Sequence, residues 1–273
     1  MTDIATKATH ITKQPAVSCT MTFSKRQTLI LESTRRSGSA RIADLAAELD
    51  VSLETIRRDI RSLVETGEIV KSHGLVSLAR QDMEAPFERR MRENLEAKIR
   101  IARHVAAGIA DGDSVMMDTG TTTSVLAREL RGKTGLTIVT NSSDVARTLA
   151  TVNGNKVYMA GGELHGDNGA AFGRSAIDFV SAFRVRHVVI SIAAIDPVGG
   201  LMDYHLAEAD FARTVLGCGE TRTVITDHSK FNRRALVRVA GFLDVDRIVT
   251  DMAPPPEIAE RLLAAGTALE IAA

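Results

Sequence analysis

Apolar residues near the start of the chain recur at the three- and four-residue intervals of amphipathic helices. We expect one helix from about Ser24 to Thr34, a break at 37–39 and a second helix that ends near Asp50. The residues expected to face the core from these helices are Leu29, Ile30, Leu31, Ile42, Leu45, Ala46 and Leu49. A turn of three or four residues then leads into a third helix, which is the spacing of a helix-turn-helix.

The third helix combines an apolar stripe with arginines on the opposite side. Ser52 is its expected N-cap, because a serine hydroxyl can accept from the free amides of the first turn. The residues expected to be buried are Ile56, Ile60, Leu63 and Val64. Those expected to face solvent near the helix start are Thr55, Arg57, Arg58 and Arg61. This arrangement favours a helix whose N-terminal half enters the major groove of DNA.

A hairpin is predicted after the third helix, for which Gly67 is the expected C-cap. Segment 68–78 alternates loosely around His73-Gly74, the pattern of a two-stranded wing. We expect His73, near the wing tip, to contact DNA. Residues 23–78 are therefore predicted to form a winged helix-turn-helix domain that binds double-stranded operator DNA.

The pattern changes after segment 79–93, a charged stretch containing Pro86 that is predicted to be a linker. From residue 94 to residue 273, short apolar runs alternate with helical stretches, as in an α/β domain with a mainly parallel sheet. The expected strands are 114–117, 136–139, 156–159, 188–195, 223–225 and 247–250. The expected helices include 99–109, 123–130, 145–151 and 175–183.

Polar loops follow several of these strands, at the edge where ligands bind in parallel α/β sheets. The loop after the first strand combines a glycine turn with hydroxyls and the exposed amides of a helix start, which can hold an anion. Its residues are Asp118, Gly120, Thr121, Thr122 and Thr123. Other strand ends contribute Asn141, Gly162, Asp227 and Lys230. Lysine and amides for charge, with Asp and Asn for hydroxyl groups, match a phosphorylated polyol.

Other site chemistries find little support in the sequence. The G-K-[ST] ending of a Walker loop and the Rossmann G-x-G-x-x-G are absent, so no nucleotide cofactor is expected. The seven histidines are scattered and no His/Cys cluster has zinc spacing, so no metal is expected. A G-x-S-x-G nucleophile elbow is also absent.

Length and charge add little to these predictions. A chain of 273 residues has room for about two domains, at roughly 100–200 residues each. The formal net charge is zero, and segment 24–80 holds ten Lys/Arg against eight Asp/Glu, a difference of two. The prediction of DNA binding therefore depends on the geometry of the third helix and not on overall charge.

The chain has the features of a cytoplasmic protein. Its two cysteines, Cys19 and Cys218, are far apart and form no C-x-x-C pair, which indicates reduced thiols. No apolar run approaches the roughly 20 residues that cross a bilayer. Residues 1–22 lack the apolar core of a signal peptide and are predicted to be a disordered tail, within which Met21 is a second candidate start.

With these motifs in hand, the chain resembles the DeoR family of transcriptional regulators. The run Val51-Ser52-x-x-Thr55-Ile56-Arg57-Arg58-Asp59 is similar to that family's most diagnostic motif. The resemblance extends over 25–270 and includes Asp118-x-Gly-Thr-Thr, Thr140-Asn141, Gly161-Gly162, Asp227-x-Ser-Lys230 and Thr250-Asp251. It implies a C-terminal domain similar in fold to ribose-5-phosphate isomerase that senses a phosphorylated sugar or polyol. Gly161-Gly162-Glu163-Leu164, the run that ends at Arg184, and the prolines up to Pro256 look most like the glycerol-3-phosphate repressor branch.

Three positions depart from the family pattern. The wing has Leu75 where the family usually has a second glycine, and leucine takes a positive φ less readily than glycine. Alanines stand in 191–196 where a glycine is common, which would narrow the effector pocket. Arg213 replaces a lysine in the motif that starts near Glu208.

The main hypothesis is a homodimeric or homotetrameric repressor without cofactor, whose operator binding is relieved by a phosphorylated sugar or polyol. Its expected effector site adds Glu208 to the strand-end residues above. The alternative is a sugar-phosphate isomerase-like enzyme with an appended helical domain, in which Asp118, Glu208 or Asp227 acts as base and Lys230 holds phosphate. A third hypothesis is a protein-interaction module that binds no specific DNA.

Overall fold

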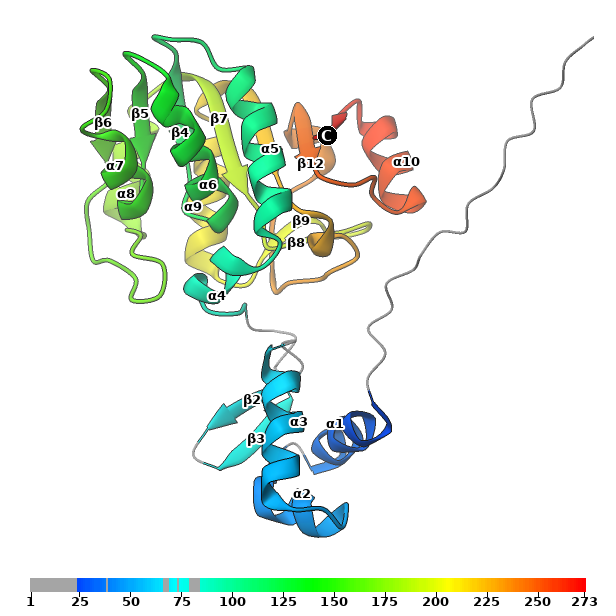
Figure 1. Cartoon of the computed structure of the whole chain (residues 1–273). Coiled ribbons are helices and arrows are strands. Elements are labelled where there is room, and N and C mark those ends of the chain that lie inside the picture. The colour runs from blue at the N-terminus through cyan, green and yellow to red at the C-terminus, as the bar shows by residue number, and fades with distance from the viewer. Residues whose placement is uncertain (1–23, 38, 66–68, 73, 79–83) are drawn as a thin grey trace, which may run out of the picture. The chain divides into compact units, whose positions relative to one another are not determined.

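The computed structural model describes residues 24–37, 39–65, 69–72, 74–78 and 84–273 (Figure 1). The chain divides into two compact units, residues 1–80 and residues 81–273. The predicted tail at 1–22, the predicted cap Gly67 and the wing residue His73 lie outside the described residues.

The first unit is a winged helix-turn-helix, as predicted. Its elements are α1 (Lys25–Ser37), β1 (Ser39–Arg41), α2 (Ile42–Glu48), α3 (Leu53–Glu65), β2 (Ile69–Ser72) and β3 (Leu75–Leu78). The wing strands β2 and β3 pair antiparallel, and β1, which the sequence pattern did not predict, pairs with the other side of β3. Leu75 begins β3 without a positive φ; the residue that has one, at +82°, is Gly74. The missing second glycine therefore causes no backbone strain in the wing.

One face of each helix forms the core of this unit. The cluster contains Ile30, Leu31, Ile42, Leu45, Ala46, Ile56, Ile60, Leu63, Ile69 and Val76. The predicted burial of Leu29 was wrong, since this side chain is 40% exposed. Successive helix residues point about 100° apart, so Leu29, Ile30 and Leu31 cannot all face one core.

The second unit contains a seven-stranded sheet in which all neighbouring strands are parallel. Its order is β13-β12-β10-β7-β4-β5-β6. The strands are β4 (Ser114–Met117), β5 (Thr137–Thr140), β6 (Lys156–Met159), β7 (Val185–Ser191), β10 (Gly219–Ile225), β12 (Arg247–Thr250) and β13 (Ala268–Ile271). The α/β class with a parallel sheet is thus confirmed.

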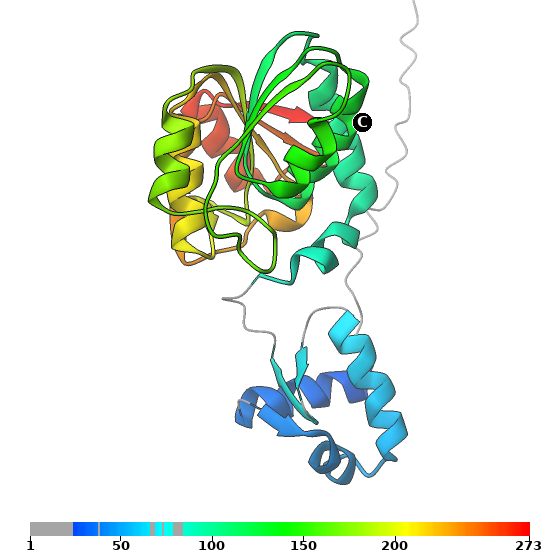
Figure 2. The same cartoon turned by 90° about the vertical axis from the view of Figure 1, so that its left-hand side faces the viewer.

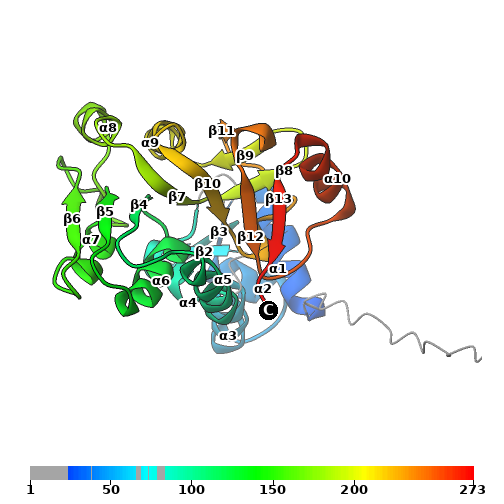
Figure 3. The same cartoon turned by 90° about the horizontal axis from the view of Figure 1, so that it is seen from above.

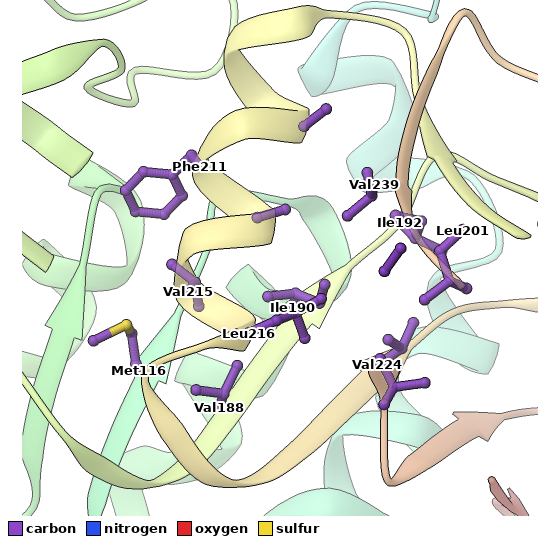
Figure 4. Packing of buried hydrophobic residues seen from close by; sticks show 14 of the residues in the cluster. Met116, Val188, Ile190, Ile192, Leu201, Phe211, Val215, Leu216, Val224 and Val239 are labelled. Carbon is purple, nitrogen blue, oxygen red and sulfur yellow. The ribbon is translucent and has the colours of Figure 1, made fainter. Parts of the chain in front are cut away.

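Helices cover both faces of this sheet, which Figure 2 shows from its β6 edge and Figure 3 from above. One face carries α5 (Leu95–Ala107), α6 (Thr121–Glu129) and α7 (Ser143–Leu149); the other carries α8 (Arg174–Ser181), α9 (Leu206–Leu216) and α10 (Pro256–Ala265). Successive side chains of β4 point to opposite faces of the sheet and pack against the helices on each face. Met116 packs in the same cluster as Phe211 and Val215 of α9 (Figure 4), whereas Val115 and Met117 pack with α5 and α6.

The predicted strand 188–195 is two strands in the structure. β7 ends at Ser191, and β8 (Ala194–Asp196) belongs to a separate antiparallel sheet of order β11-β9-β8, with β9 (Gly200–Asp203) and β11 (Val237–Ala240). Gly200 has a φ of +78°, and a Cβ there would lie 2.6 Å from the carbonyl oxygen of Ala240. The predicted apolar run therefore spans the end of one strand of the main sheet and the start of a strand of the smaller sheet.

The structure also differs from the predicted linker at residues 84–93. This segment contains α4 (Phe87–Arg92), whose first residue is buried and donates its N–H to the Asp167 carboxylate at 3.1–3.2 Å. Pro86 stands at the N-cap of α4, a position where a missing N–H costs nothing. The apolar Phe87 explains why this charged segment folds with the second unit.

Two further features concern the described residues. No helix among them is long and apolar enough to span a membrane. Likewise, no group of three or more His, Cys, Asp and Glu side chains in the described ranges is placed to hold a metal ion.

An ion pair joins α1 to α3 in the first unit. Arg26 donates from Nη2 to Oδ1 of Asp59 at 3.2 Å, and its Nε contacts the second carboxylate oxygen. Asp59 is only 9% exposed, so this acidic member of the Thr-Ile-Arg-Arg-Asp run faces inward, toward α1. Because Asp59 is buried and paired with Arg26, we assign it a structural role, whereas the neighbouring arginines face solvent.

Replacing Asp59 with Asn should lower the free energy of opening of the α3 amides by about 1–2 kcal/mol, because a buried charged hydrogen-bond partner is lost. Native-state hydrogen exchange of the full chain measures this quantity. The matched control is Glu54→Gln on the same helix, whose exposed pair with Arg57 spans 3.9 Å and should contribute little. Equal protection of α3 in the two variants would contradict the assignment.

Candidate DNA-reading helix and effector cleft

Helix α3 presents its polar start and its arginines to solvent. The Ser52 hydroxyl accepts from the Thr55 N–H at 3.2 Å, which confirms the predicted N-cap, and it lies 2.9 Å from the Thr55 hydroxyl. Arg57, Arg58 and Arg61 are exposed, while the predicted apolar stripe is buried or half-buried. One helical turn, about 6 Å, separates Arg57 from Arg61, so the three guanidinium groups can reach one stretch of a groove.

The cleft of the second unit lies where the sheet order reverses. The chain runs from β4 outward to β5 and β6, and then returns to β7 on the other side of β4. At such a switch point the loops after the two central strands diverge and leave a crevice beyond their carboxyl ends. The cavity there has an empty volume of about 550 Å³, open solvent at its mouth included. Its lining comprises Glu84, Phe87, Arg90, Asp118, Thr119, Gly120, Thr121, Thr122, Asn168, Phe172, Ser191, Ile192, Ala193, Asp203, Glu208, Phe211 and Lys230.

The floor of the cleft is a tight contact between the ends of β4 and β7. The Asp118 carboxylate accepts from the Ser191 N–H at 3.1 and 3.2 Å. A Cβ on Gly120 would lie 1.8 Å from the Ser191 hydroxyl, so only glycine fits this approach. The contact fixes the start of α6, where Thr121 and Thr122 line the cleft with first-turn amides that have no partner inside the helix.

Three carboxyl groups, the buried Asp118 and Asp203 and the half-buried Glu208, make one side of the cleft acidic. Burial raises the pKa of Asp118 well above its usual range, and the neighbouring Asp203 and Glu208 raise it further. Burial likewise raises the pKa of Asp203 and of Glu208. Asn168 donates its amide to Glu208 at 3.0 Å. Groups that bind protons this readily present less negative charge to an entering anion than ordinary carboxylates do.

Two cations face these acids. Lys230 comes from the short helix η2 (His228–Lys230), and Arg90 comes from α4. Arg90 was missed in the sequence because it lies in the predicted linker, where a charged residue gives no sign of burial. Asn168 and Asp203 were missed for a related reason, since neither follows a predicted strand.

Four of the predicted effector residues do not line the cleft. Thr123 is fully buried and donates its hydroxyl to the carbonyls of Asp118 and Gly120 at 3.1 and 3.0 Å. Asn141 is also buried and donates to the Ala171 carbonyl at 3.0 Å. Gly162, with a φ of +145°, belongs to the loop after β6 and not to the lining. These three residues support the loops around the cleft.

Asp227, the fourth, ties two elements together. Its carboxylate accepts from the Asn94 side chain and from the Ser229 N–H, both at 2.9 Å, and so joins η2 to the junction of α4 and α5. Burial opposes its ionisation, but the hydrogen bonds from Ser229 and the charges of Lys230 and Lys98 lower its pKa. Asp227 therefore holds Lys230 in place and does not reach the cleft itself.

Lys98 anchors α4 from the other side. It is buried, which lowers its pKa to about 8, and its ammonium group donates to the carbonyls of Arg90 and Glu93, the latter at 2.8 Å. These bonds cap the carbonyl end of α4 and hold it against α5. Arg90 is thus carried on a fixed element.

The predicted family departures have a clear place in the structure. Ala193 lines the cleft, as the expected narrowing requires. Arg213 lies outside the lining and donates to the carbonyl of Arg238 at 3.1 and 3.2 Å, tying α9 to β11. The arginine at this position supports the small sheet.

Comparison with known proteins agrees with both units. Residues 26–82 match the DeoR-like helix-turn-helix domain, and residues 93–252 match the DeoR C terminal sensor domain. The glycerol-3-phosphate regulon repressor of Escherichia coli (strain K12) is 33% identical over 242 residues, 89% of this chain and 96% of the relative. The HTH-type transcriptional repressor CsqR of the same strain is 35% identical over 242 residues, 89% of this chain and 93% of the relative.

Among solved structures, ribose 5-phosphate isomerase A from Methanocaldococcus jannaschii has a TM-score of 0.38 and 13% identity, covering 51% of this chain and 55% of its own. The α/β class of the second unit rests on its own sheet. Full-length matches to repressors favour a regulator over the isomerase-like alternative. The chain belongs to the DeoR family of transcriptional regulators, with a DeoR-like helix-turn-helix domain followed by a DeoR C-terminal sensor domain.

Proposed function

We propose that this regulator represses an operon of carbohydrate or polyol metabolism and leaves its operator when a phosphorylated sugar or polyol fills the cleft. One observation carries the proposal: two cations, Arg90 and Lys230, face buried carboxyl groups in the same cleft as the start of α6. Glycerol 3-phosphate is the first candidate effector, because it appears in the name of the Escherichia coli relative.

The lining suits both parts of such a molecule. The phosphate would bind Lys230, Arg90 and the first-turn amides at Thr121 and Thr122, since helix starts favour anions. Hydroxyl groups of the sugar or polyol would donate to the acidic side of the cleft, formed by Asp118, Asp203 and Glu208. Apolar contact would come from Phe172 and Phe211, with Ala193 limiting the size of the ligand.

The DNA-reading side is α3. Arg57, Arg58 and Arg61 would bind phosphates and base edges of the major groove, with Ser52 and Thr55 near the helix start fixing the register. We place His73 with them as a wing contact. Helix-turn-helix proteins commonly bind two half-sites, so a homodimer or homotetramer is part of the proposal. A cytoplasmic location is also part of it.

Release from the operator requires the effector to bind the low-affinity form of the protein more tightly than the DNA-bound form. No catalytic role is assigned to the cleft acids. Incubation with ribose, fructose and glycerol phosphates tests this point directly, because measurable turnover would favour the isomerase-like alternative.

Arg58→Ala should weaken specific operator binding by about 1–3 kcal/mol and relax sequence preference, because a base-reading side chain is lost. Fluorescence anisotropy at physiological salt, with operator and scrambled duplexes, measures both effects. Arg174→Ala, on α8 of the sensor unit, removes an exposed arginine far from α3 in sequence and serves as control. Full operator affinity in Arg58→Ala would remove this residue from the interface, and no preference for operator in the wild type would favour a protein-interaction module.

Lys230→Ala should abolish the response to the phosphorylated effector while operator binding survives. A lost charged hydrogen bond of about 1.5–3 kcal/mol weakens effector binding more than tenfold. Isothermal calorimetry with glycerol 3-phosphate gives the affinity, and Lys156→Ala on the exposed face of β6 is the matched control. Unchanged effector affinity in Lys230→Ala would exclude this lysine from the site.

A further inference from the structure

The carboxylate of Glu84 lies between the two cations of the cleft. Its Oε1 is 3.0 Å from Nη1 of Arg90 and 3.6 Å from Nζ of Lys230. The three side chains are only 13%, 13% and 18% exposed, so this is a largely desolvated arrangement and not a surface pair. An internal anion thus sits on the two groups that the proposed function assigns to the effector phosphate.

The cations are held independently of Glu84. Arg90 donates from Nε to the Ala85 carbonyl at 2.8 Å, lies 5.6 Å from the centre of the Phe87 ring, and is 4.0 Å from the Asp167 carboxylate. Lys230 is carried by η2, which the Asp227 bonds fix. If the Glu84 carboxylate leaves, both positive groups stay in position for another anion.

Glu84 itself is held only by these charges within the described part of the chain. Its two ion pairs are its attractive contacts there, and its other close acidic neighbours, Asp203 and Glu208, have their pKa values raised by it. A phosphate bound to Arg90 and Lys230 would meet the Glu84 charge at a few ångströms. Like charges only a few ångströms apart repel strongly near a protein surface, so the two anions exclude each other.

The place of Glu84 in the chain links this exclusion to the first unit. Glu84 is the first described residue after 79–83, the stretch through which the chain arrives from the helix-turn-helix unit. From Phe87 onward the chain is anchored by the bonds of α4 to Asp167 and Lys98. Among the described residues, the Glu84 side chain is therefore the attachment to the cleft that lies closest, along the backbone, to the DNA-reading unit.

We propose that Glu84 occupies the position that the effector phosphate would take, and that a phosphorylated effector must displace it from Arg90 and Lys230 to bind. This inference rests on the proposed function and adds its regulation. Effector binding is weaker than it would be without Glu84, because the release of Glu84 from the two cations costs free energy. Release of Glu84 removes its contacts with Arg90 and Lys230, near the start of the sensor unit. Effector binding and operator binding are thus coupled through one competing carboxylate.

The test is Glu84→Gln, which keeps the size of the side chain and removes its charge. Isothermal calorimetry on the full-length protein should show glycerol 3-phosphate and inorganic phosphate binding about tenfold more tightly than to the wild type. Glu84→Asp keeps the charge but shortens the reach, so its affinity should lie between the two. Glu88→Gln, an exposed glutamate on the first turn of α4, should behave like the wild type.

Operator binding gives the second measurement. Without ligand, Glu84→Gln should bind the operator more weakly than the wild type, and glycerol 3-phosphate should change that affinity less. Wild-type effector affinity in Glu84→Gln would overturn the inference and leave the proposed function standing. If the wild type and all three variants bind neither phosphate compound, the proposed function fails, and the inference fails with it.

Discussion

The close contact between the ends of β4 and β7 is the constraint on which the sensor unit depends. Because Gly120 has no side chain, the loop after β4 lies against Ser191, and the Asp118 carboxylate bonds to the Ser191 N–H. This contact aims the start of α6 into the cleft at the point where the sheet order reverses. The acidic residues, the two cations and Glu84 all line this crevice, and the contact at its base is possible because Gly120 has no Cβ.

Charge balance in that crevice explains how one site can recognise a ligand and also report on it. Acids on one side and Arg90 and Lys230 on the other suit a molecule with hydroxyl groups at one end and a phosphate at the other. Glu84 pairs with both cations, at 3.0 and 3.6 Å. A buried cation pair left without an anion would be costly, so the cleft favours one anion or the other.

The sequence was most informative where local pattern decides structure. Helical period, the Ser52 cap and strand–helix alternation predicted the winged helix-turn-helix and the parallel sheet. Strand ends also identified Asp118, Gly120 and Lys230 as residues that line the cleft. The limits were tertiary. Asn141 and Asp227 stand at the expected strand ends but bond to neighbouring loops, and Arg90 reaches the cleft from a segment with no periodic signal. Which way a polar side chain turns depends on partners far away in the chain.

Reciprocal coupling is the most direct test of a regulator that reads both DNA and a metabolite. The factor by which the tightest-binding phosphate ester, from a panel that includes glycerol 3-phosphate, weakens operator binding should equal the factor by which operator DNA weakens binding of that ester. We predict equal factors of at least about fivefold, measured by anisotropy and calorimetry in one buffer. An operator affinity that stays constant while the ester saturates the protein would contradict the account.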